Sequence, residues 1–288
     1  MARPSRVARL LLSVGDAGVH HFTYVSTGNQ KRFEQFLPHR KGRGCVINNG
    51  VELQRFESVD LSDEKFVEER FRLRSEFGFP PTARVAVFVG VYSARRPLLP
   101  ILQSLEMFLN ESQTQSIAQQ WYLLIIGDGD PAERQKIIEH DLQNRVHFAG
   151  RRSDIATFLP FCDLMVSASH YEGLSIAMLE AWSCGLPVLS YAVDGIEDVL
   201  GHEEAGRQLV PHEGGVKDYS RQWFLFMQEL AGKRAANFVS AQRRCWMKRR
   251  HFFSTNTMLE GYTNLYRIGL KKTLDGEHCS QPEVQNHE

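Results

Sequence analysis

The stretch DLMVSASHYEGLSIAMLEAWSCGLPVLSY, residues 163–191, decides the fold of this chain. Its apolar runs Asp163–Ser167 and Pro187–Tyr191 are bounded by glycine, proline or charge, which is typical of parallel strands covered on both faces. Between them, Ser175–Cys184 has the apolar spacing of a helix. A strand, a helix and a strand in this order predict one unit of a parallel sheet.

The same alternation continues on both sides of this stretch. Further strands are predicted at Val85–Gly90, Trp121–Gly127, Arg145–Gly150 and Gly206–Val210, with helices at Leu98–Leu109 and Lys217–Ala231. We therefore expect an α/β fold with a doubly wound, Rossmann-like parallel sheet. Ligands of such sheets bind outside the carboxyl ends of the strands, so the loops that follow the strands are the place to look for chemistry.

Residues 1–75 do not continue this pattern. A short strand is predicted at Phe22–Val25 and a helix around Lys31–Leu37, and the apolar run Cys45–Ile47 leads into a turn at Asn48–Gly50. The expected organisation is a short amino-terminal remnant with a linker, a sheet domain, a carboxy-terminal helix and a disordered polar tail, at residues 1–75, 76–253, 254–272 and 273–288 respectively.

Composition excludes several classes of protein. The 288 residues contain 34 Lys and Arg and 34 Asp and Glu, so no excess of positive charge favours nucleic acid as a partner. The five cysteines form no CxxC pair, which predicts reduced thiols in a cytoplasmic protein and neither a zinc site nor a disulfide framework. No apolar run is long enough to span a membrane. Lys248–Arg250 is interpreted as a solvated helix end, and the alternative is peripheral contact with anionic lipid at the inner face of the membrane.

The chemistry is expected around two carboxylates, Glu172 and Glu180. Glu172 follows a predicted strand, and Gly173 would let the backbone approach a ligand closely. The amides of Gly173, Leu174 and Ser175 then open a helix, which makes them an anion site suited to a diphosphate. Glu180 lies eight residues further, about 12 Å along a helix axis. The alternative is that the two are surface glutamates paired by coincidence.

Two neighbouring features are weaker signals. Gly127–Gly129 lacks the third glycine of a dinucleotide fingerprint, so we interpret it as a tight turn that lines the cleft. His170 could contact a ligand, but packing within the loop is the preferred interpretation.

Glu172 and Glu180 resemble the E-x7-E motif of retaining GT-B glycosyltransferases of family 4. Other segments are similar to motifs of the donor-binding domain of this family and occur in the family's order over roughly residues 20–270: Asn48–Glu52 with Phe56, Val89–Gly90 with Ser93–Arg96, Ile125–Gly129, Val146–Gly150 and Ala181–Val188.

The resemblance implies a role for each matching residue. Glu172 would contact the donor hexose and Glu180 the ribose hydroxyls. Arg96, at the position of the family's lysine, would pair with the diphosphate beside Gly90. The family's arginine is replaced by Val91, and Arg95 is the candidate that supplies the missing charge.

Two residues after the strand 145–150 complete the expected site. In the family this loop abuts the nucleotide base, which would bring Arg151 and Asp154 to the base. Asp154 is equally well interpreted as an acid at a helix N-terminus.

The function implied by the resemblance is transfer of a hexose from a nucleotide sugar to a glycan or glycolipid acceptor, with retention and without a metal or cofactor, in surface polysaccharide biosynthesis. A non-catalytic nucleotide-sugar-binding subunit or an inactive remnant is the rival, favoured by Val91 and by the short leader. A sugar-nucleotide epimerase is a further alternative. The leader resembles the end of an acceptor domain, so an acceptor-domain subunit or self-association is expected to complete the enzyme.

Overall fold

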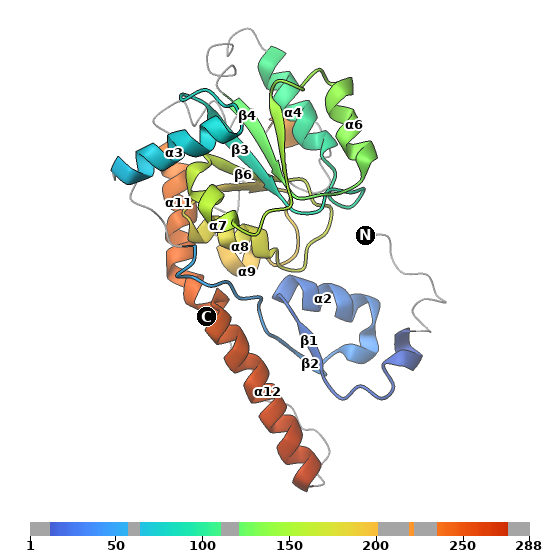
Figure 1. The fold of residues 1–288 in the computed structure, drawn as a ribbon. Coiled ribbons are helices and arrows are strands. Elements are labelled where there is room, and N and C mark those ends of the chain that lie inside the picture. The colour runs from blue at the N-terminus through green and yellow to red at the C-terminus, as the bar shows by residue number, and fades with distance from the viewer. Residues whose placement is uncertain (1–11, 57–63, 111–120, 201–218, 222–234, 276–288) are drawn as a thin grey trace.

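The computed structural model describes residues 12–56, 64–110, 121–200, 219–221 and 235–275. They form a larger α/β domain and, below it in Figure 1, a small amino-terminal unit. The long helix α12 (Thr255–Asp275) starts at the α/β domain and runs down beside the small unit. The domain boundaries expected from the sequence remain predictions.

Parallel strands form the central sheet of the larger domain. In the described part these are β3 (Arg84–Val89), β4 (Trp121–Ile126), β5 (Val146–Gly150), β6 (Leu164–Ser167) and β7 (Val188–Ser190), in the spatial order β5-β4-β3-β6-β7. The chain thus moves outward from β3 to β5 and then returns to the other side of β3. The sheet is doubly wound, as predicted, and its direction of winding switches between β3 and β6. The predicted strand Gly206–Val210 lies outside the described residues.

These strands form because each is an apolar run that can be buried on both faces. In β4, the side chains of Trp121, Leu123 and Ile125 are fully buried on one side, and Leu124 and Ile126 are 2% exposed on the other. Burial of a Val, Leu or Ile side chain contributes roughly 1.5–3 kcal/mol. The sheet is therefore the core of the domain.

Helices cover both faces of the sheet. In Figure 1, α4 (Leu99–Asn110) and α6 (Pro131–Glu139) pack together on one side. On the other side lie α3 (Glu64–Glu76), α7 (Ile155–Phe158), η3 (Leu159–Phe161), α8 (Ile176–Ser183), α9 (Ile196–Leu200), α11 (Ala235–Arg249) and η6 (Arg250–Phe253). The predicted helices Leu98–Leu109 and Ser175–Cys184 correspond to α4 and α8 within one residue at each end. The predicted helix Lys217–Ala231 lies almost entirely outside the described residues.

The small unit consists of β1 (Phe22–Tyr24), α2 (Thr27–Phe36), η1 (Pro38–Arg40) and β2 (Gly44–Val46). β1 and β2 pair in parallel, with α2 as the connection between them. The prediction of a helix around Lys31–Leu37 was wrong at its start. α2 begins four residues earlier because the hydroxyl of Ser26 accepts a hydrogen bond from the Asn29 amide at 3.0 Å and caps the helix.

Helix α12 joins the two parts of the molecule. Its first residue donates a backbone hydrogen bond to Val51, whose own amide bonds to Phe253. Further along, Gly261 packs on the small unit, because a Cβ there would lie 3.1 Å from a methyl group of Ile47. The helix ends at Asp275, so the tail expected from residue 273 is helical at its start, and residues 276–288 lie outside the described part.

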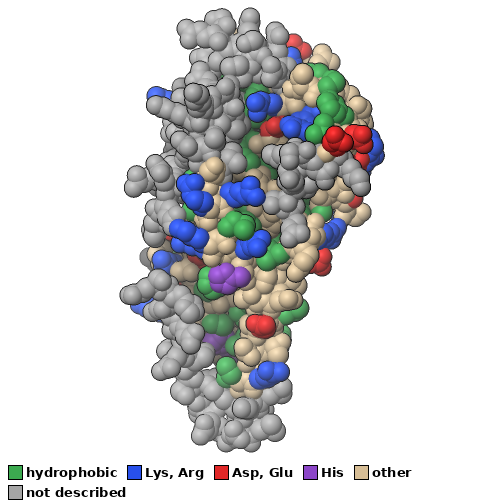
Figure 2. Space-filling view, turned by 90° about the vertical axis from the view of Figure 1, so that its left-hand side faces the viewer, with side chains coloured by type: hydrophobic (Ala, Val, Ile, Leu, Met, Phe, Trp, Pro, Cys, Tyr) green, Lys and Arg blue, Asp and Glu red, His purple; other side chains and the backbone are tan. Residues whose placement is uncertain are grey.

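Figure 2 shows the side of the molecule on which α11 lies, where Lys and Arg side chains gather. Among the described helices, none combines the length and the apolar character needed to cross a bilayer.

Candidate active site

A cavity of about 280 Å³ opens at the point where the winding of the sheet switches. Its walls come from the ends of two neighbouring strands, from the start of α8 and from one residue of the segment that follows the small unit. The lining residues are Asn49, Phe88, Val89, Gly90, Arg96, Met165, Ser167, Ser169, Glu172, Leu174, Ser175, Ile176 and Ala177. This is where doubly wound sheets bind their ligands. The sequence therefore predicted the correct edge of the sheet.

Glu172 and Arg96 form a two-bonded ion pair in this cavity. Arg96 donates from Nε to Oε1 of Glu172 at 2.6 Å and from Nη2 to Oε2 at 3.0 Å. Glu172 is 7% exposed, so its carboxylate is held largely away from water. The planar guanidinium fork matches a carboxylate in this way, whereas a lysine ammonium cannot. Neither the pairing of these two residues nor its geometry was predicted.

The third nitrogen of the Arg96 guanidinium lies toward the end of β3. A Cβ built on Gly90 would be 3.6 Å from Nη1 of Arg96. Gly90 has φ +146°, a backbone conformation that favours glycine. The charge of Arg96 therefore lies between Glu172 and the backbone of the first loop.

The start of α8 supplies backbone amides to the same cavity. Ser175 is the N-cap residue of α8, and its side chain makes no capping hydrogen bond. The first amides of α8 therefore have neither an intrahelical partner nor a side-chain cap. With Leu174, Ser175 and Ile176 in the cavity wall, the positive end of the helix faces the space in which an anion would bind.

Gly173 also packs against the small unit. A Cβ at this position would lie 2.7 Å from a methyl group of Val25. The glycine is therefore required for close packing between the two parts of the molecule, and the approach of its backbone to a ligand stays a prediction.

Glu180 lies outside this cavity, deeper along α8. Burial raises the pKa of its carboxyl group from the ordinary 4.5 to about 7, and the nearby Arg55 opposes this rise only in part. Arg55 also donates a hydrogen bond to the backbone of Ser153 at 2.8 Å. Glu180 thus neighbours the loop after β5, whereas Glu172, in the loop after β6, is bonded to the loop after β3 through Arg96.

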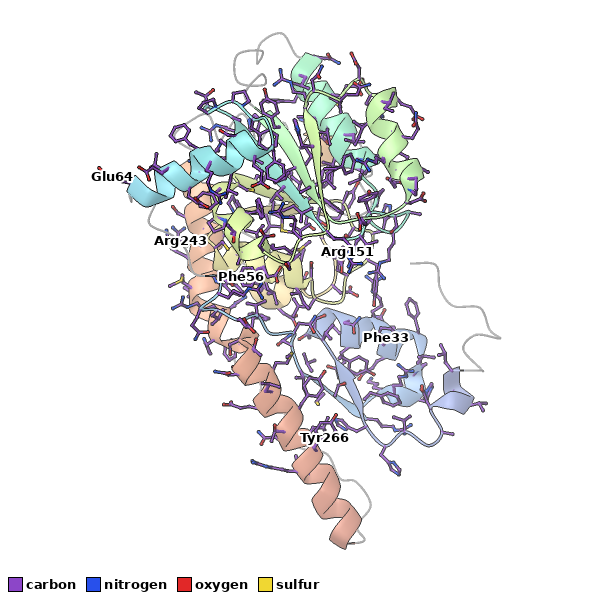
Figure 3. The ribbon with its side chains drawn as sticks, viewed as in Figure 1. Phe33, Phe56, Glu64, Arg151, Arg243 and Tyr266 are labelled. Carbon is purple, nitrogen blue, oxygen red and sulfur yellow. The ribbon has the colours of Figure 1, made fainter. Side chains whose placement is uncertain are left out.

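The loop after β5 contains the two residues predicted to contact the base. Asp154 is the N-cap residue of α7, but its carboxylate makes no capping bond and pairs with Arg152 through two hydrogen bonds of 2.9 Å. The hydrogen bond from Arg152 lowers the pKa of Asp154. Arg151 is exposed and lies on the side of the domain that faces α2 (Figure 3). Neither Arg151 nor Asp154 lines the cavity.

The first loop of the domain rests on the next one. A Cβ on Gly127 would lie 2.1 Å from the carbonyl oxygen of Gly90, and one on Gly129 would lie 2.0 Å from that of Tyr92. The turn at Gly127–Gly129 therefore supports the loop after β3. It does not belong to the lining of this cavity, and its place in a wider cleft stays a prediction.

Arg95 and Val91 also lie in the first loop. Both are exposed, and neither is part of the cavity lining. The carbonyl of Arg95 accepts a hydrogen bond from the amide of His170 at 3.0 Å, which connects this loop to the loop of Glu172. His170 is exposed, and its ring stacks on Tyr191 with centroids 6.1 Å apart, so the packing interpretation of His170 stays a prediction.

The small unit holds the loop of Glu172 in place, which sequence analysis did not predict. Ser26 donates to the carbonyl of Gly173 at 2.6 Å, and Asn29 donates to the hydroxyl of Tyr171 at 2.8 Å. These two bonds lie on either side of Glu172. Ser26 and Gly173 are 147 residues apart in the sequence, and Asn29 and Tyr171 are 142 residues apart. No local motif could therefore predict these bonds.

A second set of contacts connects α2 to α9 and to the segment before it. Arg32 pairs with Asp194 at 2.7 Å, and the amide of Thr27 bonds to Asp198 at 2.6 Å. Asp198 thereby places a negative charge at the positive end of α2. The small unit is thus bonded to both loops that flank α8 and β7.

Comparisons with known proteins agree with this architecture. Residues 83–222 match the family described as glycosyl transferases group 1. The N-acetyl-alpha-D-glucosaminyl L-malate synthase of Bacillus anthracis is 26% identical over 245 residues, which cover 81% of this chain and 60% of the relative. The N,N'-diacetylbacillosaminyl-diphospho-undecaprenol alpha-1,3-N-acetylgalactosaminyltransferase of Campylobacter jejuni is 23% identical over 211 residues, which cover 73% of this chain and 52% of the relative.

The chain therefore spans about half to three fifths of the lengths of these two relatives. Among solved structures, the crystal structure of Anabaena HepE in complex with UDP and glucose superposes with a TM-score of 0.74 at 18% identity, covering 92% of this chain and 68% of that one. This likeness shows the GT-B fold. The family match covers residues 83–222, which contain the strands of the central sheet and all but one of the residues that line the cavity.

Proposed function

We propose that this chain binds a nucleotide sugar and belongs to an enzyme that transfers its hexose, with retention, to a glycan or glycolipid acceptor in surface polysaccharide biosynthesis. The observation that carries the proposal is the cavity at the switch point, where the Arg96–Glu172 pair faces the first amides of α8. The named activities of the relatives support it, because the Campylobacter protein is a glycosyltransferase whose name specifies a lipid-linked substrate.

The proposed arrangement places the diphosphate in the cavity. The amides at the start of α8 and the guanidinium of Arg96 would share its negative charge. The hexose would lie against Glu172, and the nucleoside would extend out of the cavity toward Glu180, Arg151 and Asp154. A cavity of about 280 Å³ is too small for a whole nucleotide sugar, which agrees with a ligand that extends beyond it.

The donor can engage the Arg96–Glu172 pair in two ways. Two of the guanidinium nitrogens bond to the carboxylate, and the third lies near Gly90. Arg96 can use that third nitrogen for the diphosphate while it still holds Glu172, or the pair can open and both groups turn to the donor. In either case the guanidinium stays close to the phosphate that leaves.

The proposed reaction breaks the bond between the anomeric carbon of the hexose and the diphosphate oxygen. The acceptor hydroxyl attacks the same face of the sugar, which preserves the anomeric configuration. Its proton passes to the leaving phosphate oxygen. The negative charge that develops on this oxygen is stabilised by Arg96 and by the amides of α8. These groups are already oriented toward the oxygen, so no solvent has to reorganise during the reaction. The proposal assigns no step to a metal or cofactor.

A non-catalytic nucleotide-sugar-binding subunit is the second candidate. The observation that favours it is Val91, which is 59% exposed at the position where the resembling family has a cation. A site with one cation fewer would bind the diphosphate but stabilise the leaving group less.

A thermal-shift screen of the purified chain against a panel of nucleotide sugars and nucleoside diphosphates tests the binding step. A ligand that binds only the folded state raises the melting temperature, by an amount that grows with concentration. Analysis of the products after incubation then separates the two candidates. Hydrolysis of the donor or transfer of its sugar supports the enzyme, and binding without turnover supports the subunit. No shift with any nucleotide would overturn both.

A further inference from the structure

The outer side of α11 and η6 carries a basic face that the proposed function does not use. We define this basic face by six exposed residues: Arg243, Arg244, Met247, Lys248, His251 and Phe252. They occur as adjacent pairs four residues apart, so they lie along one side of the helix and its continuation. Figure 2 shows basic side chains gathered on this side of the molecule, and in Figure 3 the side chain of Arg243 points away from the domain.

The inner side of the same helix is fixed to the domain. The side chain of Gln242 bonds to the amide and the carbonyl of Val188, each at 2.9 Å, and accepts a hydrogen bond from Trp182 at 3.0 Å. Cys245 and Trp246 are 3% and 2% exposed. The fold therefore depends on the inner residues, and the basic face is presented on a rigid support.

Positive charge is concentrated here, although the whole chain is neutral. Residues 230–259 contain seven of the 34 Lys and Arg residues and none of the 34 Asp and Glu residues, so the rest of the chain is net negative. No carboxylate in the described part of the chain forms an ion pair with Arg243, Arg244 or Arg250. A concentrated charge of one sign favours a partner of the opposite sign.

The two apolar members of the basic face indicate the kind of partner. Met247 is 49% exposed and Phe252 is 40% exposed, and both lie among cations. The phosphates of a DNA duplex would pair with the cations and leave the side chains of Met247 and Phe252 in water. At the surface of a bilayer, basic side chains pair with anionic headgroups while apolar side chains enter the boundary with the acyl chains. We infer that the basic face binds a membrane surface that contains anionic lipid.

This inference does not depend on the proposed function, because it requires neither donor nor acceptor. It also accounts for the phenylalanine at position 252, which the packing of the core does not require. Consecutive residues Phe252 and Phe253 have opposite environments: Phe253 is 2% exposed and stacks on Trp246, whereas Phe252 faces outward. The ring of Phe252 lies 3.8 Å from that of His251 and, together with Met247, gives the basic face the apolar contacts that a membrane-binding surface uses.

The test is sedimentation of the full chain with lipid vesicles. We expect binding to vesicles of equal parts phosphatidylcholine and phosphatidylglycerol, and little binding to phosphatidylcholine alone. In the double variant Arg243→Gln/Lys248→Gln, the partition coefficient should fall on the order of thirtyfold, since each cation near an anionic surface contributes about a fivefold increase. The double variant Lys31→Gln/Lys41→Gln removes the same charge from exposed residues of the small unit and should bind as the unchanged chain does.

A second variant separates the apolar contribution. Met247→Ser/Phe252→Ser should reduce the part of the vesicle binding that persists at high salt, because salt screens only the electrostatic part. Circular dichroism verifies that each variant is folded. Equal vesicle binding by the unchanged chain and by Arg243→Gln/Lys248→Gln would overturn the inference. It would also be overturned if that variant lost binding to a short DNA duplex but kept its binding to vesicles, which would identify a nucleic-acid surface.

Discussion

The loop before α8 and the helix α8 itself each contain a glutamate, Glu172 and Glu180, and the environments of these two side chains differ. In the loop, the carboxylate of Glu172 is 7% exposed and bonds twice to Arg96. On the helix, Glu180 is partly buried, and burial raises its pKa to about 7. The sequence predicted one site in which the two glutamates have different partners, but it did not predict how their environments differ. The structure gives one carboxylate paired with a cation and one whose charge is only partly stabilised.

This difference shows that the environment, and not the residue type, assigns the role of each glutamate. Glu172 is suited to hold a fixed direction toward a bound sugar because both of its oxygens are already oriented. Glu180 gains or loses a proton near neutral pH, so its strength as an acceptor depends on pH. The following experiments test the contrast, from the largest expected effect to the smallest.

Arg96→Ala should have the largest effect because it leaves the carboxylate of Glu172 buried without its cation. We expect the free energy of unfolding to fall by about 3 kcal/mol, as measured by urea denaturation. Binding of nucleoside diphosphates should weaken far more than binding of the free nucleoside. Arg95→Ala is the companion: damage from both variants would mean that Arg95 replaces the cation missing at Val91. If neither variant changed the affinity for nucleoside diphosphates, the proposal that the cavity binds the diphosphate would be wrong.

Glu172→Gln keeps the shape of the side chain and removes its charge. The proposed partner of Glu172 is the hexose, so affinity for the intact donor should fall by roughly 1.5–3 kcal/mol, while affinity for the nucleoside diphosphate stays nearly constant. Titration calorimetry with both ligands measures the difference. An equal loss for the two ligands would show that Glu172 does not contact the sugar.

Glu180→Ala should weaken the binding of nucleotide and nucleotide sugar alike, by about 1.5 kcal/mol, because its proposed partner is the ribose that both contain. Glu139→Ala, an exposed glutamate at the end of α6, is the matched control and should bind both ligands normally. Unchanged affinities in Glu180→Ala would remove the ribose role.

The raised pKa of Glu180 predicts a smaller effect on stability. Between the ordinary pKa of 4.5 and the folded value of about 7, the folded chain binds this proton more readily than the unfolded chain does. The contribution of Glu180 to stability therefore falls as the pH rises through this window. A glutamine at this position does not titrate, so Glu180→Gln should not lose stability in this pH range. At pH 8 the free energy of unfolding of the variant should exceed that of the unchanged chain by on the order of 1 kcal/mol after allowance for solvent screening. Thermal denaturation of both proteins at pH 5 and pH 8 measures it, and an equal difference at the two values would contradict the pKa.

Removal of divalent metal should have the smallest effect. If Arg96 and the amides of α8 neutralise the diphosphate, EDTA should leave the affinity for nucleoside diphosphates unchanged. A large gain in affinity on addition of Mg²⁺ to EDTA-treated protein would show that these groups do not suffice.

The sequence predicted those parts of the fold that depend on local patterns. The apolar runs identified β3 to β7, and the glycines and charges that bound them placed the loops, so the cavity lies at the predicted edge. The pairing of Arg96 with Glu172 spans 76 residues and depends on how the loops after β3 and β6 meet, which no spacing along the chain encodes. Asp154 shows the same limit: its place at a helix start was predicted, but its partner Arg152 was not.

Gly173 shows that one sequence pattern can have two structural explanations. Glycine at the start of a helix beside a carboxylate suggested room for a ligand, and Val25 of the small unit packs closely against it. The packing of two parts of a chain on one another is a tertiary effect, and it requires small residues for the same steric reason as a ligand does. Sequence alone does not distinguish the two.

The bonds from Ser26 to Gly173 and from Asn29 to Tyr171 have a mechanical consequence. Glu172 is held between them, so a rotation of the small unit against the sheet domain would have to break one of these bonds or drag the carboxylate with it. A donor that fixes Glu172 in one position would in turn favour one orientation of the small unit, since coupling between two binding events acts equally in both directions. Binding of a ligand in the cavity would therefore change the orientation of α2 relative to the sheet domain, and with it the position of any surface that the small unit contacts.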